Sequence, residues 1–395
     1  MSTWPQYDDD QIAEVVGILK SGKVNAWTSP HVRAFEEDYE GYLGRRHAIA
    51  VANGSVALDL ALIGLDLQPG DEVIVTPRSY VASAACVPLA GGVPVFADVD
   101  RHSQNLSAAT IAEKITPRTR AIIVVHLAGW PCDMDEIMSL AEKHDLCVIE
   151  DCSQAHGATY NGRPVGSIGH IATFSFCQDK IITTGGEGGL VALDDDALWQ
   201  RMWSYKDHGK NHDAVFRTDH PPGFRWLHES FGTNWRMTSI QAAMGSYQLA
   251  RLHDTHAIRS RNAGVLIDAF DRCPALRIPV PPPSMEHAWY RLYAFVRPER
   301  LRPGWDRDRI LAAMVQRGLP CFSGSCSEIY LEKAFRSHGF TPSERLEAAR
   351  ELGDTSFAFL IDPTIDSAAL KRTAETFVEI VQAATVPEAM LQVAK

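Results

Sequence analysis

Lys180 is the first residue whose setting suggests chemistry. It follows Ile171–Phe176, an apolar run with the length of a buried strand. An ammonium group at the end of such a strand loses water, so we expect its pKa to fall and the amine to become able to form an imine with an aldehyde. The alternative is a lysine that reaches solvent from a strand end.

Asp151 stands at the end of a second apolar run, Leu146–Glu150. Open α/β sheets bind ligands at the carboxyl ends of their strands. A carboxylate in that place can keep a proton on the ring nitrogen of a bound heteroaromatic cofactor, as pyridoxal chemistry requires. The alternative is a helix cap, because Asp is a good N-cap residue.

Three small residues are candidates for binding an anion. Gly54 and Ser55 stand between a predicted strand and a predicted helix, where backbone N–H groups and a hydroxyl can bind a phosphate. Ser175 lies five positions before Lys180 and adds a second hydroxyl. The glycines of Gly185–Gly189 allow close backbone approach. The alternatives are that Ser55 only caps the helix and that the glycines only connect two strands of a hairpin.

Further candidates lie in two later connections. Tyr80 follows the predicted strand Glu72–Thr76 and can place its ring over a flat cofactor, although a core tyrosine is the alternative. Asn234 and Arg236 offer an amide and a guanidinium to a phosphate or carboxylate. The alternative for this pair is the solvated end of a loop.

Short apolar runs alternate with helical patterns between residues 47 and 193, which indicates an α/β fold with a largely parallel sheet. We predict helices at Ser55–Asp66 and Met134–Lys143, on the spacing of their apolar residues. The predicted strands, about seven, are His47–Asn53, Glu72–Thr76, Pro94–Asp98, Ala121–Val125, Leu146–Glu150, Ile171–Phe176 and Gly189–Leu193.

The pattern changes after residue 194. Lys206–Thr233 is a long polar and aromatic stretch, typical of a functional lid or an interface arm. A long helix at Thr238–Leu266 should lead into a second domain, with a proline-rich turn at Pro281–Pro283. The remaining predicted elements are a helix at Leu198–Tyr205, a strand at Ala288–Val296, and helices at Arg307–Gln316 and Ser367–Ala384.

Composition narrows the class of protein. The chain has 395 residues and a formal charge of −11, and no segment gathers basic residues with interleaved aromatic ones, so we expect no nucleic-acid binding. The first ten residues are polar and acidic, and no apolar run spans a bilayer, so we expect a cytoplasmic protein that does not bind membranes. The eight cysteines include no C-x-x-C pair, so we expect reduced thiols and no metal. A redox or metal role for Cys321 and Cys326 is the alternative.

Taken together, these motifs and their order resemble the DegT/DnrJ/EryC1/StrS family of sugar aminotransferases. The resemblance extends from Ser29–Phe35 to His287–Tyr290 and so covers nearly the whole chain. It implies a fold-type-I pyridoxal-phosphate enzyme, in which a large domain with a mostly parallel seven-stranded sheet between helices is joined to a smaller C-terminal α+β domain. We place the large cofactor-binding domain at residues 1–255 and the small domain at residues 256–395.

The resemblance also implies roles for single residues. Lys180 forms the imine with pyridoxal phosphate and moves protons at the substrate carbon, while Asp151 pairs with the ring nitrogen. Gln154 bonds the phenolic oxygen of the ring and Tyr80 stacks on the ring. The phosphate is held by Gly54, Ser55 and Ser175 and by Asn234 from the other subunit of a homodimer. Arg236, His208, Trp27 and Trp289 are substrate-contact candidates, although packing or solvent exposure is the alternative for the last three.

Three residues depart from the family pattern. Gln178 and Asp179 stand where many relatives carry Pro or Thr before the lysine, and Ser55 stands where Thr is common. We expect Asp179 to face away from Lys180, since an inward carboxylate would raise the pKa of the amine. A subgroup that replaces the lysine by histidine contains sugar dehydratases, and Lys180 argues against that outcome.

The predicted reaction is transfer of an amino group from glutamate or glutamine to a keto-sugar, most readily a nucleotide-linked 3- or 4-keto-6-deoxy sugar. Such a reaction belongs to the biosynthesis of amino sugars, surface polysaccharides or glycosides. The alternatives are a cyclitol aminotransferase, a pyridoxal-phosphate-dependent sugar dehydratase, and a non-catalytic regulator that binds the cofactor. The sequence leaves the sugar, its carrier nucleotide and the position aminated open.

Overall fold

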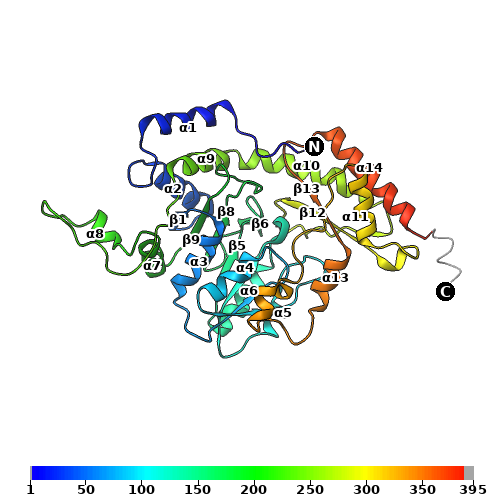
Figure 1. The fold of residues 1–395 in the computed structure, drawn as a ribbon, viewed down its shortest axis with the longest axis horizontal. Helices are drawn as coiled ribbons and strands as arrows, with labels where there is room; N and C mark the ends of the chain where they lie inside the picture. The colour runs from blue at the N-terminus through cyan, green and yellow to red at the C-terminus, as the bar shows by residue number, and fades with distance from the viewer. Residues whose placement is uncertain (1, 387–395) are drawn as a thin grey trace.

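A central sheet of seven strands organises the protein, whose computed structural model describes residues 2–386 (Figure 1). The strand order is β1-β9-β8-β5-β4-β2-β3, and only β9 runs antiparallel to its neighbours. The strands are β1 (His47–Val51), β2 (Glu72–Val75), β3 (Val93–Phe96), β4 (Thr119–Val125), β5 (Cys147–Asp151), β8 (Ile171–Ser175) and β9 (Gly189–Leu193). All seven coincide with predicted runs, so the predicted α/β fold with a mostly parallel sheet is confirmed.

Helices cover both faces of the sheet, because successive side chains of a strand point to opposite faces. In β1, Ala48 and Ala50 join a core with α2 and α9, whereas Ile49 and Val51 join the core under α3, α4 and α6. Strands with two buried faces are apolar throughout, which is why they were readable as continuous runs. The helices of this part are α1 (Asp9–Ser21), α2 (His31–Leu43), α3 (Gly54–Leu65), α4 (Ala82–Leu89), α5 (Ala108–Ala112), α6 (Met134–His144), α7 (Asp196–Lys206) and α9 (Ser239–Ala250).

Two predicted elements have different boundaries in the structure. The single helix predicted at Thr238–Leu266 is two helices, α9 and α10 (Leu252–Phe270), since the Arg251 N–H bonds the Gln248 and Leu249 carbonyls and closes the last turn of α9. The strand predicted from Ala288 begins only at Arg291, because Trp289 has a positive φ of 52° that a strand does not adopt.

A second core gathers the C-terminal elements around α10. The antiparallel sheet β10-β12-β13 packs against α10, α11 and α14. This core starts with Ala263, within α10, and the segment from Ile329 to Leu352 packs instead on the core of the large sheet. The elements that contribute to this core besides α10 are β10 (Leu276–Arg277), β12 (Arg291–Val296), β13 (Ser356–Leu360), α11 (Arg307–Gln316) and α14 (Ser367–Ala384). The helices α12 (Lys333–Ser337) and α13 (Glu347–Thr355) belong to the segment on the large sheet. The division at residue 255 stays a prediction.

Short elements complete the fold. A small sheet has the order β11-β6-β7, formed by Met285–Glu286, Thr159–Tyr160 and Arg163–Pro164. Single turns of 3-10 helix lie at Leu127–Gly129, Pro298–Arg300 and Ile329–Leu331. No helix within residues 2–386 has the combination of length and apolar character that crossing a membrane requires.

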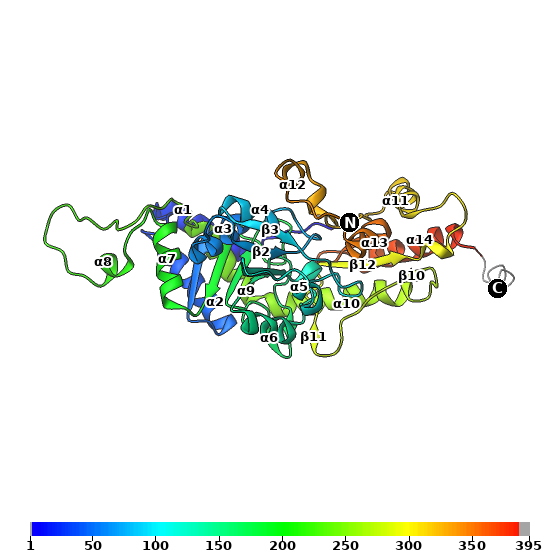
Figure 2. The same cartoon turned by 90° about the horizontal axis from the view of Figure 1, so that it is seen from below.

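The stretch predicted as a lid or interface arm projects away from the body of the protein, as Figures 1 and 2 both show. We call residues 207–233 the arm; it contains the short helix α8 (His212–Phe216). The two ends of the arm are joined by backbone hydrogen bonds: the Asn211 N–H donates to the Leu227 carbonyl, and the Glu229 N–H donates to the Gly209 carbonyl. Toward the tip, Phe224 and Trp226 are 78% and 86% exposed.

Candidate active site

The candidate residues converge on the carboxyl ends of neighbouring strands. Asp151 ends β5, Ser175 ends β8, and Lys180 lies five residues further on. Tyr80 follows β2, and β2, β4, β5 and β8 are consecutive parallel strands. Parallel strands end at one edge of a sheet, which is where such sheets bind ligands.

Asp151 is buried and its carboxylate is held by two donors. The Ser83 hydroxyl donates to Oδ2 at 2.9 Å, and the Ser153 N–H donates to Oδ1 at 3.1 Å. Turns and not a helix follow Asp151, so the alternative of a helix cap is wrong. Ser83, whose hydroxyl lies 3.1 Å from that of Ser79, was missed by the sequence reasoning, since a serine near the start of a helix carries no distinctive signal.

Gln154 is oriented by the backbone of the loop after β4. Its Oε1 accepts the Ala128 N–H at 2.8 Å, and the side chain is buried. Because the oxygen is used in this way, the NH2 group of the amide is the part left to donate. Ala128 has a positive φ of 60°, a conformation that non-glycine residues rarely adopt.

The start of α3 and the end of β8 form a cradle for an anion. Asn53 caps α3 by accepting the Val56 N–H at 3.0 Å, so the alternative that Ser55 is the cap is wrong. The first N–H groups of a helix, here those of Gly54 and Ser55, have no partner within the helix. A Cβ on Gly54 would lie 2.5 Å from the Ser175 Cβ, so only glycine lets Ser175 come this close.

The glycine cluster also serves this cradle. A Cβ on Gly189 would lie 2.3 Å from the Asn53 carbonyl oxygen. Residue 189 must therefore be glycine for β9 to lie this close to the start of α3. The cluster does connect the antiparallel strands β8 and β9, as the hairpin alternative proposed. Both interpretations of the glycines therefore hold.

His156 contacts the backbone of Ser175. Its Nε2 lies 2.9 Å from the Ser175 carbonyl oxygen, and its Nδ1 lies 3.2 Å from the Tyr39 hydroxyl. An Nε2–H donor and an Nδ1 acceptor satisfy both contacts, so the ring is neutral. Burial lowers the pKa of His156 to about 4, which agrees with this state.

The Lys180 side chain is mostly buried and lies between two partners. Its Nζ is 3.4 Å from the Tyr290 hydroxyl oxygen and 3.6 Å from Oδ1 of Asp179. The expectation that Asp179 faces away is therefore wrong. It turns inward because the Tyr290 hydroxyl donates a hydrogen bond to its carboxylate and Arg291 lies 3.8 Å from it.

These partners also overturn the expected direction of the lysine pKa. Burial alone lowers the pKa of the Lys180 ammonium, but Tyr290 and Asp179 act in the opposite direction and the pKa is raised. The carboxyl of Asp179 is itself partly buried, yet Lys180 and the Tyr290 hydroxyl hold its pKa below the ordinary value. Tyr290 and Asp179 therefore favour the protonated form of the Lys180 amine.

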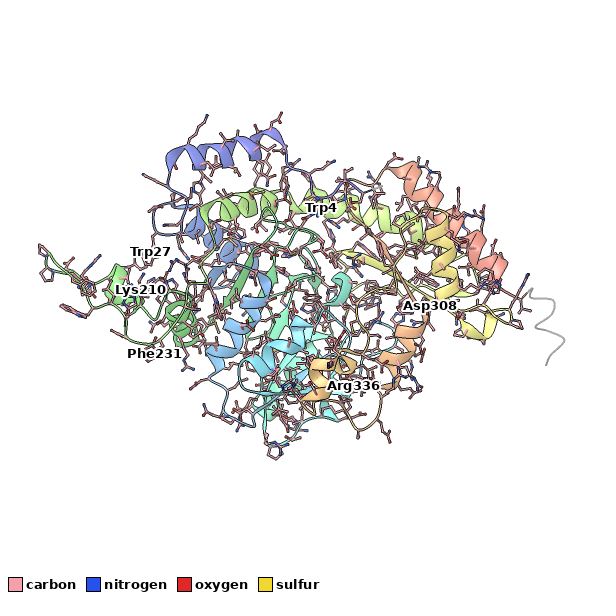
Figure 3. The ribbon with its side chains drawn as sticks, viewed as in Figure 1. Trp4, Trp27, Lys210, Phe231, Asp308 and Arg336 are labelled. Carbon is pink, nitrogen blue, oxygen red and sulfur yellow. The ribbon has the colours of Figure 1, made fainter. Side chains whose placement is uncertain are left out.

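The N-terminal segment reaches this centre, which the sequence did not indicate. Trp4 donates from Nε1 to the Lys180 carbonyl oxygen at 2.9 Å, and the guanidinium carbon of Arg259 lies 5.3 Å from the centre of the Trp4 ring (Figure 3). The contact with Lys180 joins residues 176 positions apart, and no short motif could have announced it.

The remaining site candidates occupy different places. Tyr80 is 68% exposed, so the alternative of a core tyrosine is wrong and its ring is free to cover a ligand. Asn234 follows the arm and accepts the Arg236 N–H on its side chain at 3.4 Å. Arg236 donates to Asp207 at 2.8 Å, so the base of the arm already uses part of this guanidinium. All three stay predictions as ligand contacts.

The other three predicted substrate contacts, Trp27, His208 and Trp289, also lie in different places. Trp27 stacks on Phe216 of the arm at 5.8 Å and lies under the Lys210 ammonium, 4.2 Å from its ring centre (Figure 3). His208 has a positive φ of 62° in the turn that starts the arm. Trp289 stacks on His287 at 4.1 Å. Within this chain Trp27 and Trp289 pack on aromatic neighbours, and their roles as substrate contacts stay predictions.

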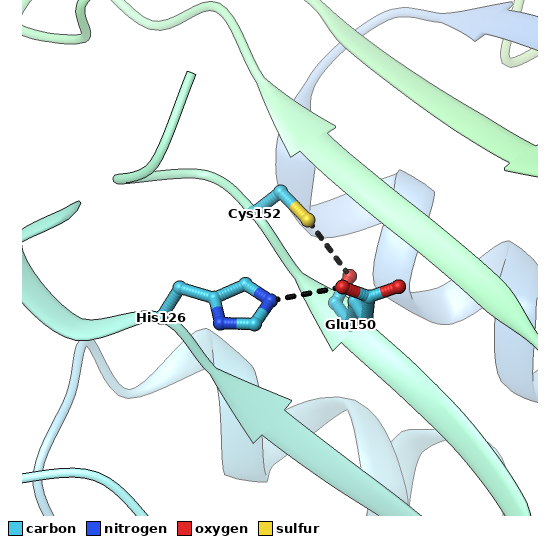
Figure 4. Close-up of side chains that lie close together, drawn as sticks. All are labelled: His126, Glu150 and Cys152. Atoms are coloured by element: carbon cyan, nitrogen blue, oxygen red, sulfur yellow. Dashed lines mark hydrogen bonds and ion pairs between the residues drawn. The ribbon is translucent and has the colours of Figure 1, made fainter. Parts of the chain in front are cut away.

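A buried cluster of His126, Glu150 and Cys152 has the residue types of a metal site (Figure 4). The His126 Nδ1 accepts the Cys132 N–H at 2.9 Å, so its Nε2 carries the proton that Glu150 accepts at 3.0 Å. Both imidazole nitrogens are therefore occupied.

Glu150 also accepts backbone N–H groups from the turn before β8, namely those of Gly166, Ile168 and Gly169. Burial alone raises the pKa of Glu150, but the His126 and backbone donors outweigh it and the pKa is lowered. The cluster fixes the turn between β7 and β8, and so the position of the strand that carries Ser175.

Comparisons with known proteins agree with this geometry. Residues 5–378 match the model of the DegT/DnrJ/EryC1/StrS aminotransferase family. The chain is 46% identical to GDP-perosamine synthase of Caulobacter vibrioides over 230 residues, which are 58% of this chain and 59% of that relative. It is 32% identical to dTDP-3-amino-3,4,6-trideoxy-alpha-D-glucose transaminase of Streptomyces venezuelae, over 90% of this chain and 87% of that relative.

The fold is shared with a solved structure over almost its whole length. The aminotransferase from Psychrobacter cryohalolentis superimposes with a TM-score of 0.95 and 50% identity, over 97% of this chain and 99% of that one. The resemblance expected from the motifs and the fold-type-I architecture are therefore confirmed.

Proposed function

The chain belongs to the DegT/DnrJ/EryC1/StrS aminotransferase family, and we propose that it transfers an amino group from glutamate or glutamine to a nucleotide-linked keto-sugar with Lys180 as the cofactor-binding lysine. One observation carries the proposal. A mostly buried lysine amine, a buried carboxylate and an anion cradle lie at or just after the carboxyl ends of strands, at one edge of the sheet.

The residues fit pyridoxal phosphate, the cofactor of this family. The cradle at Gly54 suits a phosphate, which carries a charge of about −1.5 to −2 near neutral pH and needs several donors. Asp151, buried and acceptor-only when ionised, suits a protonated ring nitrogen. When bound, pyridoxal phosphate supplies the aldehyde that takes the amino group and the ring that delocalises the electrons left on the substrate carbon.

Each side chain has one task in this proposal. Lys180 holds the cofactor and moves a proton at the substrate carbon that gains or loses the amino group. Asp151, oriented by Ser83, keeps the proton on the ring nitrogen, and the NH2 group of Gln154 donates to the phenolic oxygen. Tyr80 covers the ring and excludes water from one face of it.

We further propose a homodimer whose arms complete the two sites, with Asn234 reaching the phosphate in the partner subunit. The support is the arm itself, which holds Phe224, Trp226 and Phe231 in solvent although each is large and apolar. Phe224 and Trp226 also pack on each other, with ring centres 5.4 Å apart, and exposed apolar surface of this kind marks an interaction site in a folded protein.

The acceptor is proposed from two relatives whose names describe aminated nucleotide sugars, one carried by GDP and one by dTDP. Because the two relatives differ in the carrier nucleotide, the carrier and the aminated carbon must be determined by experiment. Incubation with glutamate and a panel of GDP- and dTDP-linked 3- and 4-keto-6-deoxy sugars, followed by mass spectrometry, identifies the amino-sugar product. Absence of product with every acceptor, together with no consumption of glutamate or glutamine, would exclude the proposed reaction.

The role of Lys180 is tested with Lys180→Ala. We expect loss of the absorbance band of the cofactor-bound protein and a fall in amination rate of at least about 10⁴-fold, the upper range for loss of an acid–base group. Lys20→Ala, at the end of α1, is the matched control and should leave both unchanged. Undiminished transamination by Lys180→Ala would refute the proposed role.

A further inference from the structure

Asp179, Tyr290 and Lys180 form a triangle in which each side chain touches the other two. The Tyr290 hydroxyl donates to Oδ2 of Asp179, Lys180 Nζ lies 3.4 Å from the Tyr290 oxygen, and Lys180 Nζ lies 3.6 Å from Oδ1 of Asp179. Tyr290 directly precedes β12 and lies 110 positions along the chain from Lys180. The triangle therefore links the lysine to the segment that leads into β12.

The direction of the hydrogen bonds follows from the number of protons. A phenol has one proton, and Tyr290 gives it to Asp179, so the Tyr290 oxygen faces Lys180 as an acceptor. An ammonium has three N–H donors and no acceptor. The Tyr290 ring also lies 5.0 Å from Nζ, close enough for its face to attract a cation.

We propose that Asp179 and Tyr290 form a holding site that receives the ε-amino group of Lys180 whenever that amine is not joined to the cofactor. Tyr290 accepts an N–H of the amine, and Asp179 fixes the Tyr290 hydroxyl and neutralises the ammonium charge. Both are positioning residues for Lys180. The inference rests on the proposed function only in that Lys180 is the cofactor lysine.

Other charged groups around the triangle leave this arrangement intact. Cys177 and His156 face Lys180, Arg291 faces Asp179 at 3.8 Å, and Arg259 faces Tyr290. His156 is neutral, whereas the two arginines compete with Lys180 for the negative charge. The pKa of the Lys180 amine is raised despite that competition and despite burial.

An amine held in this way stays beside the cradle instead of turning into solvent. The holding site favours the protonated form, so the amine must give up a proton before it can bond the cofactor again. Removing the Asp179 carboxylate should therefore make the free Lys180 amine more reactive toward a label, but should slow the enzyme because the amine is less well placed. A residue with only a packing role would produce neither effect.

The test uses the full-length protein freed of pyridoxal phosphate by dialysis against an amine. Lys180 is labelled with acetic anhydride across a range of pH, and labelling is read by mass spectrometry with Lys20 as the internal reference. We expect Asp179→Asn and Tyr290→Phe to lower the pH midpoint of Lys180 labelling. A midpoint lower by one pH unit raises the labelling rate below the midpoint about ten-fold.

Tyr247→Phe is the matched control, because Tyr247 also donates its hydroxyl to a carboxylate, Asp8, at 2.8 Å beside an arginine, but on the surface of α9. It should leave the Lys180 midpoint unchanged. Asp179 is 52% exposed, so Asp179→Asn folds even if Tyr290→Phe does not, and thermal melting checks both.

In the cofactor-loaded enzyme, Asp179→Asn should lower kcat about ten-fold with little change in KM for the amino donor. This is less than the roughly 10²–10⁴-fold contribution of an acid–base group itself, because Lys180 remains. Asp179→Glu should restore most of it. An unchanged Lys180 midpoint in Asp179→Asn overturns the holding site. Since labelling needs neither cofactor nor sugar, a shifted midpoint in a protein that fails to transaminate supports the holding site and contradicts only the proposed function.

Discussion

At the carboxyl edge of the sheet the polar groups are buried and paired, whereas the arm carries its aromatic rings in water. Asp151 and Gln154 each have a partner within the chain, at 2.9 and 2.8 Å. Phe231, near the end of the arm, is fully exposed. Buried polar groups need partners, and the first region supplies them within one chain, whereas exposed aromatic rings such as those of the arm gain from being covered.

Asp151→Asn should break the first region most severely. We expect kcat for amination to fall about 10²–10³-fold, because an amide cannot balance a positive ring nitrogen as a carboxylate does. Steady-state amination rates measure the effect. Asp145→Asn is the matched control, since Asp145 lies on the surface with a φ of 54°, which asparagine tolerates. Rates for Asp151→Asn within two-fold of the native protein would contradict the role of this carboxylate.

Replacing Phe224, Trp226 and Phe231 together by Ser should affect the second region, the arm, and weaken the proposed dimer. We expect the dimer dissociation constant to rise by at least about 10²-fold, since burial of one large apolar side chain contributes about 1.5–3 kcal/mol. Sedimentation velocity over a concentration series measures it, and circular dichroism should be unchanged. Val315→Ser, 62% exposed on α11, is the control. A triple variant that dimerises as tightly as the native chain would show that these three side chains of the arm do not form the dimer interface.

Gly54→Ala tests the anion cradle, which belongs to the first region. The added Cβ would lie 2.5 Å from the Ser175 Cβ, so α3 and β8 must move apart. We expect the Kd for pyridoxal phosphate to rise roughly ten-fold, which corresponds to about 1.4 kcal/mol. Gly17→Ala, where a Cβ meets nothing within 4 Å, should leave it unchanged. Equal affinity in both variants would place the phosphate elsewhere.

Ser83→Ala should have the smallest effect. It removes one of the two donors to the Asp151 carboxylate, and we expect the free energy of unfolding in urea to fall by about 1 kcal/mol. Amination should slow by only a few-fold, because the carboxylate itself remains. Ser337→Ala, which removes an exposed hydroxyl bonded to the Ala334 carbonyl, is the control. A larger loss from Ser337→Ala than from Ser83→Ala would contradict the buried pairing.

Much of the fold and part of the site were predictable. The seven strands were readable because both faces of the sheet are buried, which makes each strand a short apolar run. The residues Gly54, Asp151, Ser175 and Lys180 were singled out because polar residues that follow such runs fall at one edge of a parallel sheet. The start of β12 was misplaced because Trp289 takes a positive φ, which its side chain does not announce.

The sequence by itself determined the order of strands and helices and which chemical groups stand at their ends, since both depend on short-range composition and periodicity. Only the tertiary structure decided which groups meet. Ser83 reaches Asp151 across 68 positions, Tyr290 reaches Lys180 across 110, and Trp4 reaches Lys180 across 176. Such contacts depend on how the strands are ordered in the sheet and how the loops turn. That is also why Asp179, expected to face outward, turns inward to Tyr290, which lies 111 positions further along the chain.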